Sequence, residues 1–398
     1  MKFSHLADCH IGGWNDDKLK KIGMEAFRRT IRKSIELNVG FIIIAGDLFN
    51  TALPQMDLVK EVAAILDEAR NANISVYVVA GSHDCSPSGK TMLDVLEQAG
   101  LIENVAKIKE ENEKITLDFV EDKTGVKLTG LPGKRAGLEI EDYRKLNKEN
   151  LEKEEGIKIF LFHTTLDEFK PEWLKQVTGA ETKTLPKNFN YYAGGHVHYI
   201  FDIKKDDYGV MTYPGALFPN NFKELEEFKH GGFYLVNIEN GNLSHEYINV
   251  KVKDVVSFRV DVEGLDADAA TNKIIDEISK ENFEDKIVTL RVKGVLKNSK
   301  ASQIRIKDIS RRLDKAYSVL RNFSKVTSED IENIKIEEGS IEDVEHKMIK
   351  EAVLENDKLA DSLLNVLNCE KEEGEKNLDF EKRLIKNVDS LLGIEDDY

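Results

Sequence analysis

Apolar runs alternate with amphipathic stretches along the N-terminal part of the chain. The unbroken apolar run at 41–46 is followed directly by Asp47, which is typical of a strand that is buried on both faces. Similar runs lie on either side of it, at 2–7 and 75–80. Between the runs lie two stretches with apolar residues at helical spacing, 16–38 and 55–72. This β-α-β-α-β order predicts a mainly parallel sheet with right-handed crossovers.

The middle of the chain carries a second set of strands. Apolar stretches recur at 115–119, 126–130, 158–162 and 191–195. Residues 199–250 then have the pattern of hairpins, so we expect an antiparallel second sheet. The charged stretch 139–155 predicts an exposed helix. Two sheets with helices outside them predict one α/β domain over residues 1–250.

The last third of the chain changes character. Residues 251–335 predict a small α+β domain with strands at 258–262, 286–292 and 304–306 and helices at 265–280 and 308–322. Residues 336–398 are highly charged and carry two amphipathic helical stripes joined by the spacer 370–377. Such stripes need a surface on which to dock.

Composition narrows the class of protein. No run of 18 apolar residues exists, so we expect no transmembrane helix, and the N-terminus lacks the layout of a secretory signal. The three cysteines, Cys9, Cys85 and Cys369, are odd in number and widely spaced, which favours a reducing cytoplasm. The net charge of −16 disfavours a nucleic-acid ligand, but residues 336–398 alone hold 19 acidic and 8 basic residues. The acidity is therefore concentrated in the tail.

Metal-type ligands follow five of the predicted strands. They are Asp8 with His10, Asp47, His83, His163, and His196 with His198. Each histidine alone is more often a polar loop or core residue, but five such strand ends together predict a site. Mixed Asp/His ligation suits Mn²⁺, Zn²⁺ or iron, and the oxygen ligands favour Mn²⁺.

Two metal ions about 3.5–4 Å apart need a bridging ligand, and the carboxylate of Asp47 can bridge whereas an imidazole cannot. Such a pair would neutralise a phosphodiester and activate a water. His83 is then free to protonate the leaving oxygen, and Asp84 is placed to hold its imidazole in the useful tautomer.

These motifs resemble those of the calcineurin-like metallophosphoesterases, and within them the SbcD family of DNA double-strand-break-repair nucleases in its archaeal and eukaryotic form. The motifs are Asp8-Cys9-His10-Ile11-Gly12, Gly46-Asp47-Leu48-Phe49, Gly81-Ser82-His83-Asp84, Phe162-His163 and Gly195-His196-Val197-His198. The narrower family rests on Leu48-Phe49, on the continuation 86–90 and on the downstream domains. The resemblance implies a two-sheet metallophosphoesterase sandwich flanked by helices, with a small α+β capping domain and a C-terminal helix–loop–helix.

The resemblance also assigns roles. It implies one metal ion held by Asp8, His10, Asp47 and His198, and a second held by Asp47, His163, His196 and the residue at 82. His83 would be the catalytic acid. Most relatives have Asn at the position of Ser82, whose side chain is shorter and a weaker donor, so the second metal site is where this chain departs from the pattern.

The resemblance also implies a role for each domain of the chain. The resemblance implies a nuclease core at 1–250, a capping domain at 251–335 that seats DNA, and an acidic tail at 336–398 that binds an SbcC-type SMC-like ATPase. It also implies a homodimer that acts on duplex ends and single strands at the nucleoid. Lys90, Lys134 and Arg135 lie on loops near the motifs and are the favoured DNA contacts, ahead of the basic residues of 286–307.

Three functions compete at this point. The first is a two-metal DNA exonuclease and endonuclease of a break-repair complex. The second is a phosphatase of the same superfamily, which would need neither a capping domain nor partner helices. The third is a DNA-end tether whose catalysis is weakened through Ser82. Binding of two metal ions per chain would separate the third from the first.

Overall fold

The structure is a computed structural model of the chain. It describes residues 1–86, 91–111, 113–170, 178–239, 241–329, 383 and 385–387. Residues Met1–Val326 form one compact unit, and Thr327–Tyr398 form a second unit. Lys90 and most of the predicted tail lie outside the described residues, and the described tail residues are helical. No helix among the described residues is long and apolar enough to cross a membrane.

The first sheet has six strands in the order β14-β13-β1-β2-β3-β4. The strands β1 to β4 are parallel, as the N-terminal pattern predicts, and β13 runs antiparallel to β1. The bounds are β1 (Lys2–Leu6), β2 (Phe41–Ala45), β3 (Ser75–Val79), β4 (Glu103–Asn104), β13 (Gly231–Glu239) and β14 (Asn242–Val250).

The second sheet has the order β11-β12-β10-β9-β8-β7, and it is mixed. Its four inner strands are parallel, and only the edge strands β11 and β7 pair antiparallel. The bounds are β7 (Val120–Glu121), β8 (Lys127–Leu131), β9 (Lys158–His163), β10 (Tyr191–Gly195), β11 (Phe201–Lys205) and β12 (Gly209–Tyr213).

The prediction of an antiparallel second sheet was therefore wrong. Every residue of β9 and β10 is buried, which is typical of parallel strands covered on both faces. The two predicted hairpins exist, but one forms the edge β11–β12 of the second sheet and the other forms β13–β14 in the first. Hairpin turns alone did not reveal which sheet each strand joins.

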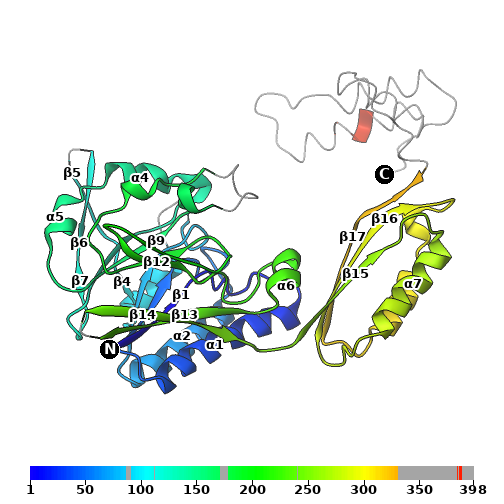
Figure 1. Ribbon diagram of the computed structural model, residues 1–398, viewed down its shortest axis with the longest axis horizontal. Coiled ribbons are helices and arrows are strands. Elements are labelled where there is room, and N and C mark those ends of the chain that lie inside the picture. Colours follow the sequence, from blue (N-terminus) through cyan, green and yellow to red (C-terminus); the bar gives the residue numbers. More distant parts are fainter. Residues whose placement is uncertain are drawn as a thin grey trace. The chain divides into compact units, whose positions relative to one another are not determined.

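Helices cover the outer face of each sheet, and the two sheets pack against each other (Figure 1). The helices of this part are α1 (Asp17–Glu36), α2 (Met56–Asn71), α3 (Met92–Gln98), α4 (Glu139–Lys145), α5 (Glu149–Lys153) and α6 (Phe222–Phe228). A small hairpin, β5 (Lys107–Glu111) and β6 (Lys114–Asp118), lies beside α4. The charged stretch 139–155 thus forms two short helices instead of one.

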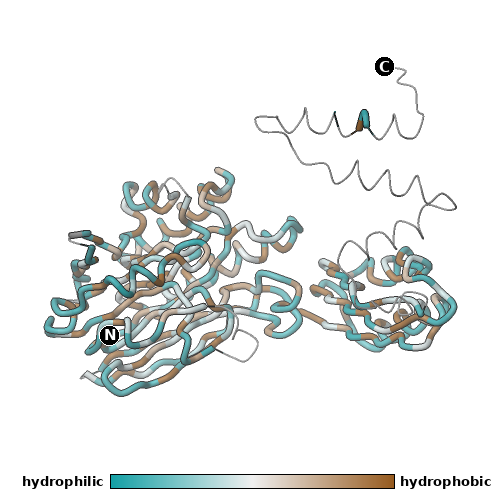
Figure 2. Tube along the Cα trace, turned by 90° about the horizontal axis from the view of Figure 1, so that it is seen from above, coloured by the Kyte–Doolittle hydropathy of each residue, from teal (hydrophilic) through white to brown (hydrophobic). Residues whose placement is uncertain are grey.

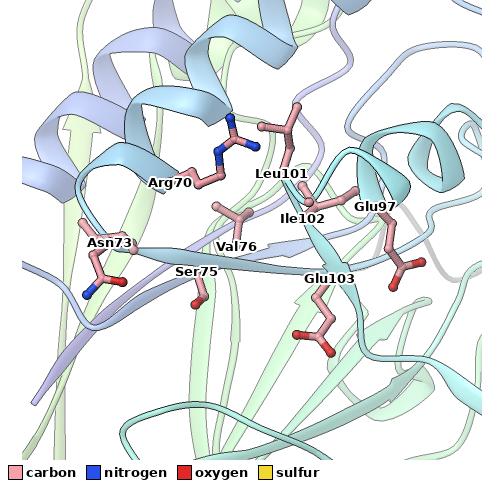
Figure 3. Close-up of a pocket in the computed structure, with 10 residues that line it drawn as sticks. Arg70, Asn73, Ser75, Val76, Glu97, Leu101, Ile102 and Glu103 are labelled. Carbon is pink, nitrogen blue, oxygen red and sulfur yellow. The ribbon is translucent and has the colours of Figure 1, made fainter.

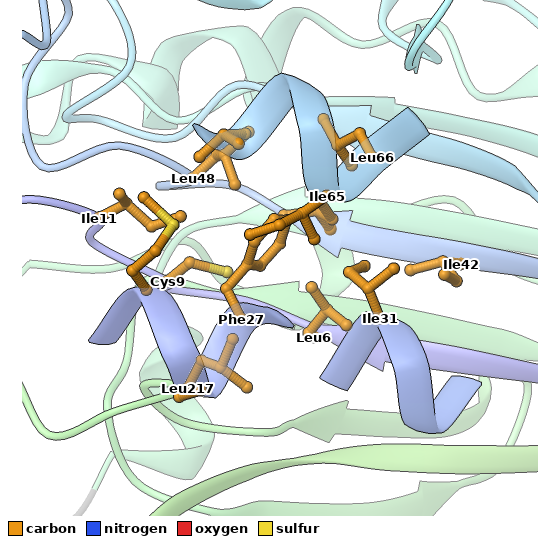
Figure 4. Packing of buried hydrophobic residues seen from close by; sticks show 14 of the residues in the cluster. Leu6, Cys9, Ile11, Phe27, Ile31, Ile42, Leu48, Ile65, Leu66 and Leu217 are labelled. Carbon is orange, nitrogen blue, oxygen red and sulfur yellow. The ribbon is translucent and has the colours of Figure 1, made fainter. Parts of the chain in front are cut away.

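Strand β2 shows how this layering arises. Ile42 points into the core that the sheet forms with α1 and α2, where Phe27 and Ile65 also lie (Figure 4). Ile44 belongs to the same core. Phe41 and Ile43 point the other way, into the core between the sheets. Successive side chains of a strand alternate between its faces, so an unbroken apolar run fits only a strand with a core on each side. In Figure 2 the outer loops of the described parts are mainly hydrophilic.

A third sheet, β15-β16-β17, has its own hydrophobic core. We call it, with its two helices, the third-sheet subdomain. Its elements are β15 (Val255–Asp261), α7 (Ala267–Ser279), β16 (Ile287–Leu296), α8 (Ile306–Arg312) and β17 (Ser318–Ser328). The predicted strand at 304–306 is wrong, since Ile304 is a buried loop residue before α8. The predicted helix at 308–322 ends at Arg312, because the residues from Ser318 onward pair as a strand.

Candidate metal centre

The carboxyl ends of four strands from the two sheets meet in one place. Asp8 and Asp47 follow the neighbouring strands β1 and β2, His163 ends β9, and His196 and His198 follow β10. Three overlapping groups have ligand atoms that all lie within 4.8 Å of one another: Asp8 with His10 and His198, His10 with Asp47 and His83, and Asp8 with Asp47 and His163. The structure therefore brings together six of the residues that the motifs singled out, whereas His196 belongs to none of these groups.

Four of these side chains are carried on left-handed backbone. The φ angles are 49° at Asp8, 42° at His10, 51° at Asp47 and 87° at His196. This region is uncommon for residues other than glycine, and such residues cluster at functional sites. Backbone hydrogen bonds hold two of the loops together, from Asp8 N to Gly46 O at 3.1 Å and from His10 N to Asp47 O at 2.9 Å.

The donor atoms fit divalent metal ions. The Nε2 atoms of His10 and His198 face each other at 3.0 Å, and an imidazole nitrogen without a proton is a metal ligand. The buried Nε2 of His163 makes no well-formed hydrogen bond and lies 3.3 Å from Asp47 Oδ2. The Asp47 carboxylate thus lies between histidines of both sheets, where a bridging ligand is expected.

Hydrogen bonds behind the site fix which nitrogen of each ring faces it. The Nδ1 of His163 donates to the carbonyl oxygen of Ala45 at 2.8 Å, and that of His198 donates to Glu224 Oε1 at 2.9 Å. Both acceptors lack a proton, so both Nε2 atoms are left to face the cluster. Sequence reasoning missed Glu224, because an acidic residue in the first turn of a short helix is ordinarily a solvated one.

Burial and mutual charge separate the pKa values of the cluster. Burial raises the pKa of Asp8 to about 7, and burial lowers that of His10 to about 3 and that of His196 to about 4. For Asp47 and His163 burial opposes charge, but their attraction outweighs it, so the pKa of Asp47 falls and that of His163 rises to about 10. Neutral imidazoles such as His10 and His196 are in the state that metal ligation requires.

Glycines leave the space into which the His163 ring fits. A Cβ atom on Gly46 would lie 2.1 Å from His163 Nδ1, and one on Gly133 would lie 2.5 Å from its Cδ2. A Cβ on Gly195 would meet the Ala45 carbonyl oxygen at 1.9 Å. The motif glycines are therefore required by close packing. Gly133 lies outside the motifs, and only the fold reveals it.

The structure corrects the role predicted for Asp84. Its buried carboxylate accepts from the backbone nitrogens of Gly81 at 2.9 Å and Phe49 at 3.0 Å, and so it ties two loops together. His83 instead has its Nδ1 2.9 Å from the carbonyl oxygen of Asn50. A backbone carbonyl leaves no signature in a sequence, so Asn50 could not have been predicted.

An open cavity of about 870 Å³ adjoins the cluster. Its lining includes Ser82, His83, Lys134, Arg135, Gly137 and His196. Two of the three predicted DNA contacts thus lie beside the site, while Lys90 is outside the described residues. Lys134 also forms an ion pair with Asp142 at 2.5 Å.

A second cavity, of about 400 Å³, lies at the opposite end of β3 (Figure 3). Arg70, Asn73 and Ser75 line it, and they precede β3 or begin it. The metal-type ligands follow the carboxyl ends of the strands, so this cavity is separate from the cluster.

The fold and the cluster define a layered α/β protein with a candidate centre for divalent metal ions. Residues 1–199, half of the chain, match the family model described as calcineurin-like phosphoesterase. The chain therefore belongs to the calcineurin-like phosphoesterase family, whose domain implies divalent metal ions.

Named relatives cover most of the chain. A DNA double-strand break repair protein Mre11 of Methanococcus maripaludis is 28% identical over 399 residues, which is 92% of this chain and 98% of the relative. The protein of the same name from Archaeoglobus fulgidus is 26% identical over 371 residues, or 85% and 77% of the two chains. Among solved structures, a dimetal phosphatase from Danio rerio is 8% identical with a TM-score of 0.42, and the match covers 64% of this chain and 97% of that one.

Proposed function

We propose that this protein is a two-metal phosphodiesterase that cleaves DNA in double-strand break repair. The cluster centred on Asp47 carries the proposal, because it joins carboxylates and imidazoles from both sheets around one shared carboxylate. The names of the relatives supply the substrate class, and the match to them extends beyond the family domain.

The two proposed ions would be held by seven residues. The first would take Asp8, His10, Asp47 and His198, and the second would take Asp47, His163, His196 and Ser82. Bound ions of this kind neutralise phosphate oxygens and lower the pKa of a bound water towards about 7. Mixed oxygen and imidazole ligation suits several metal ions, and we assign Mn²⁺ because the oxygen ligands favour it over softer ions.

His83 is the proposed acid. With Nδ1 directed at Asn50 O, its Nε2 is available to deliver a proton to the leaving 3′ or 5′ oxygen. The ring lies edge-on to His10 with centroids 4.9 Å apart, so that proton would be released next to the first metal site. A positioned acid of this kind contributes about 10²–10⁴-fold to the rate.

The remaining parts extend the proposal to DNA and partners. Lys134 and Arg135, which line the cavity, would contact the backbone of duplex ends and single strands without reading sequence. The domains are a nuclease core at 1–250, a capping domain at 251–335 and a partner-binding tail at 336–398. The tail would bind an SbcC-type ATPase, and the enzyme would act as a homodimer at the nucleoid in the cytoplasm.

Ser82 supports one alternative, a DNA-end tether with weakened catalysis. Its hydroxyl oxygen is the side-chain ligand that this position offers to the second ion, where most relatives of the resembled family carry an amide.

Mn²⁺-dependent cleavage of a linear duplex and a single-stranded circle tests both functions. We expect the native chain to cleave, His83→Gln to lose about 10²–10⁴-fold in rate while still binding Mn²⁺, and Ser82→Asn to change the rate modestly. No cleavage by the native chain, together with cleavage by the Ser82→Asn variant, would establish the tether. No cleavage by either chain, with a partner ATPase supplied, would overturn the nuclease.

A further inference from the structure

Helix α6 carries two glutamates that face different parts of the fold. Glu224 and Glu226 are two positions apart, so their side chains leave the helix in directions that differ by about 200°. Glu224 faces His198, and Glu226 faces the third-sheet subdomain. One short helix therefore contacts both a proposed metal ligand and another layer of the fold.

On the first side, Glu224 is held firmly. Its Oε1 accepts from His198 Nδ1 at 2.9 Å, and its Oε2 accepts from the backbone nitrogen of Asn220 at 2.8 Å. A turn of the His198 ring would break this hydrogen bond unless the carboxylate turned with it. The direction of His198 Nε2, which faces His10, consequently depends on where α6 lies.

On the second side, Glu226 is buried and joins two strands. Arg259 of β15 donates to its Oε1 at 2.9 Å, and Arg291 of β16 donates to its Oε2 at 3.0 Å. The two arginines are register partners on neighbouring strands, where like charges destabilise a sheet. Arg291 also stacks 4.8 Å above the ring of Phe222, the first residue of α6. The glutamate thus neutralises a cationic pair that the subdomain presents to the helix.

The helix itself is too short to be stable alone. It spans the seven residues Phe222–Phe228 and is capped at its C-terminus by Lys229, whose φ is 62°. Isolated helices of this length are not stable in water, so its position is set by its tertiary contacts. Loss of the contacts of Glu226 is therefore expected to shift α6 and, with it, Glu224.

We propose that α6 couples the third-sheet subdomain to the first metal site, with Glu226 as a positioning residue for His198. The inference rests on the metal centre of the proposed function and adds a route by which a ligand seated on the subdomain changes metal affinity. Coupling of this kind is reciprocal, so metal binding also restrains the subdomain.

Mn²⁺ titration calorimetry on the full chain tests the coupling. We expect Glu224→Gln to weaken one of two Mn²⁺ sites by about 10- to 100-fold, as for other groups that orient a metal-bound histidine. Glu226→Gln, which touches no proposed ligand, should weaken the same site by about 2- to 30-fold and leave the other site unchanged. Glu227→Gln is the matched control, because Glu227 is an exposed neighbour on the same helix.

Hydrogen exchange supplies a readout that does not depend on activity. Mn²⁺ should slow exchange in α6, β15 and β16 of the native chain but not of Glu224→Gln. The Glu226→Gln variant is expected to fold, since Val255 and Ile287 of the subdomain also pack in the core that the first sheet forms with α1 and α2. If Glu226→Gln had the same Mn²⁺ affinity and the same Mn²⁺-dependent hydrogen exchange as the native chain, this inference alone would be overturned. If the native chain bound no Mn²⁺, the proposed function would be overturned as well.

Discussion

His198 and His163 belong to the same cluster, but different parts of the fold hold them. His198 depends on Glu224 of a two-turn helix that is itself anchored to the third-sheet subdomain. His163 is fully buried at the end of β9, bonded to the backbone of β2 and enclosed by glycines. The first arrangement can be adjusted from a distance, while the second is fixed by the two sheets.

The proposed ligand sets of these two halves differ as well. The first half has Asp8, His10 and His198, all of which lie close together. The second half has His163 and His196 with the short side chain of Ser82 beside the open cavity. The half that contains His163, which we call the rigid half, thus has the weaker ligand set. The half that contains His198, which we call the adjustable half, has the complete set.

The largest expected change in unfolding free energy comes from disturbing the packing around His163. Gly46→Ala places a Cβ 2.1 Å from His163 Nδ1 at a φ of +87°, and we expect a loss of about 2–5 kcal/mol of unfolding free energy. The bound Mn²⁺ should fall from two ions to one. Urea unfolding and Mn²⁺ titration measure the two quantities.

Gly125→Ala is the control for that variant. Gly125 has a similar φ of +81° but nothing within 4 Å of the added Cβ, so only the backbone cost of about 1–2 kcal/mol should remain. Equal losses in the two variants would show that the packing around His163 contributes nothing.

Removal of the metal ions has the next largest expected effect, and it tests whether a second ion binds beside residue 82. At free Mn²⁺ about 100 times the dissociation constant, each occupied site adds about 2.7 kcal/mol of stability, which a chelator removes. Because the amide of Ser82→Asn supplies a stronger ligand, that variant should lose more stability on chelation than the native chain. Thermal unfolding with Mn²⁺ and with chelator measures the difference, and equal losses would count against a second ion beside residue 82.

The smallest expected change in unfolding free energy comes from Glu226, which anchors α6 to the third-sheet subdomain. Burial opposes the charge of Glu226, but Arg259 and Arg291 outweigh it and lower its pKa. Its contribution is therefore complete above pH 4.5, the ordinary value, and is lost as the pH falls through the lower folded-state pKa. Glu226→Gln should cost about 1–2 kcal/mol at pH 7 and progressively less in acid. Denaturant unfolding from pH 7 to pH 3.5 checks this, and a pH-independent difference would contradict it.

The sequence predicted the cluster better than it predicted the sheets. Each site residue ends or follows a buried strand, and parallel strands of an open sheet place their carboxyl ends together, so Asp8, Asp47 and His163 could be predicted from the local sequence pattern. The pairing of the second sheet was not, since strand neighbours such as β9 and β10 are set by contacts between distant segments. The confusion of β17 with a helix has the same cause.

The groups that hold the site residues in place could not be predicted from the sequence, for a different reason. Glu224 acts through its place in space, the Asn50 carbonyl is common to every residue type, and Gly133 matters only because His163 lies beside it. None of these roles leaves a spacing or composition signal. The proposed metal ligands can be predicted from sequence motifs, whereas the groups that hold them in place are found mainly from the three-dimensional structure.

The left-handed backbone at Asp8 and Asp47 has a consequence for the design of inactive tool proteins. Alanine at either position would remove the carboxylate and also favour a different chain path, so the loop would change together with the charge. Asparagine tolerates this backbone region and keeps the shape of the side chain. Asp8→Asn and Asp47→Asn are therefore the cleaner choices for a metal-deficient protein whose surface still resembles the native one, for example as bait for partners.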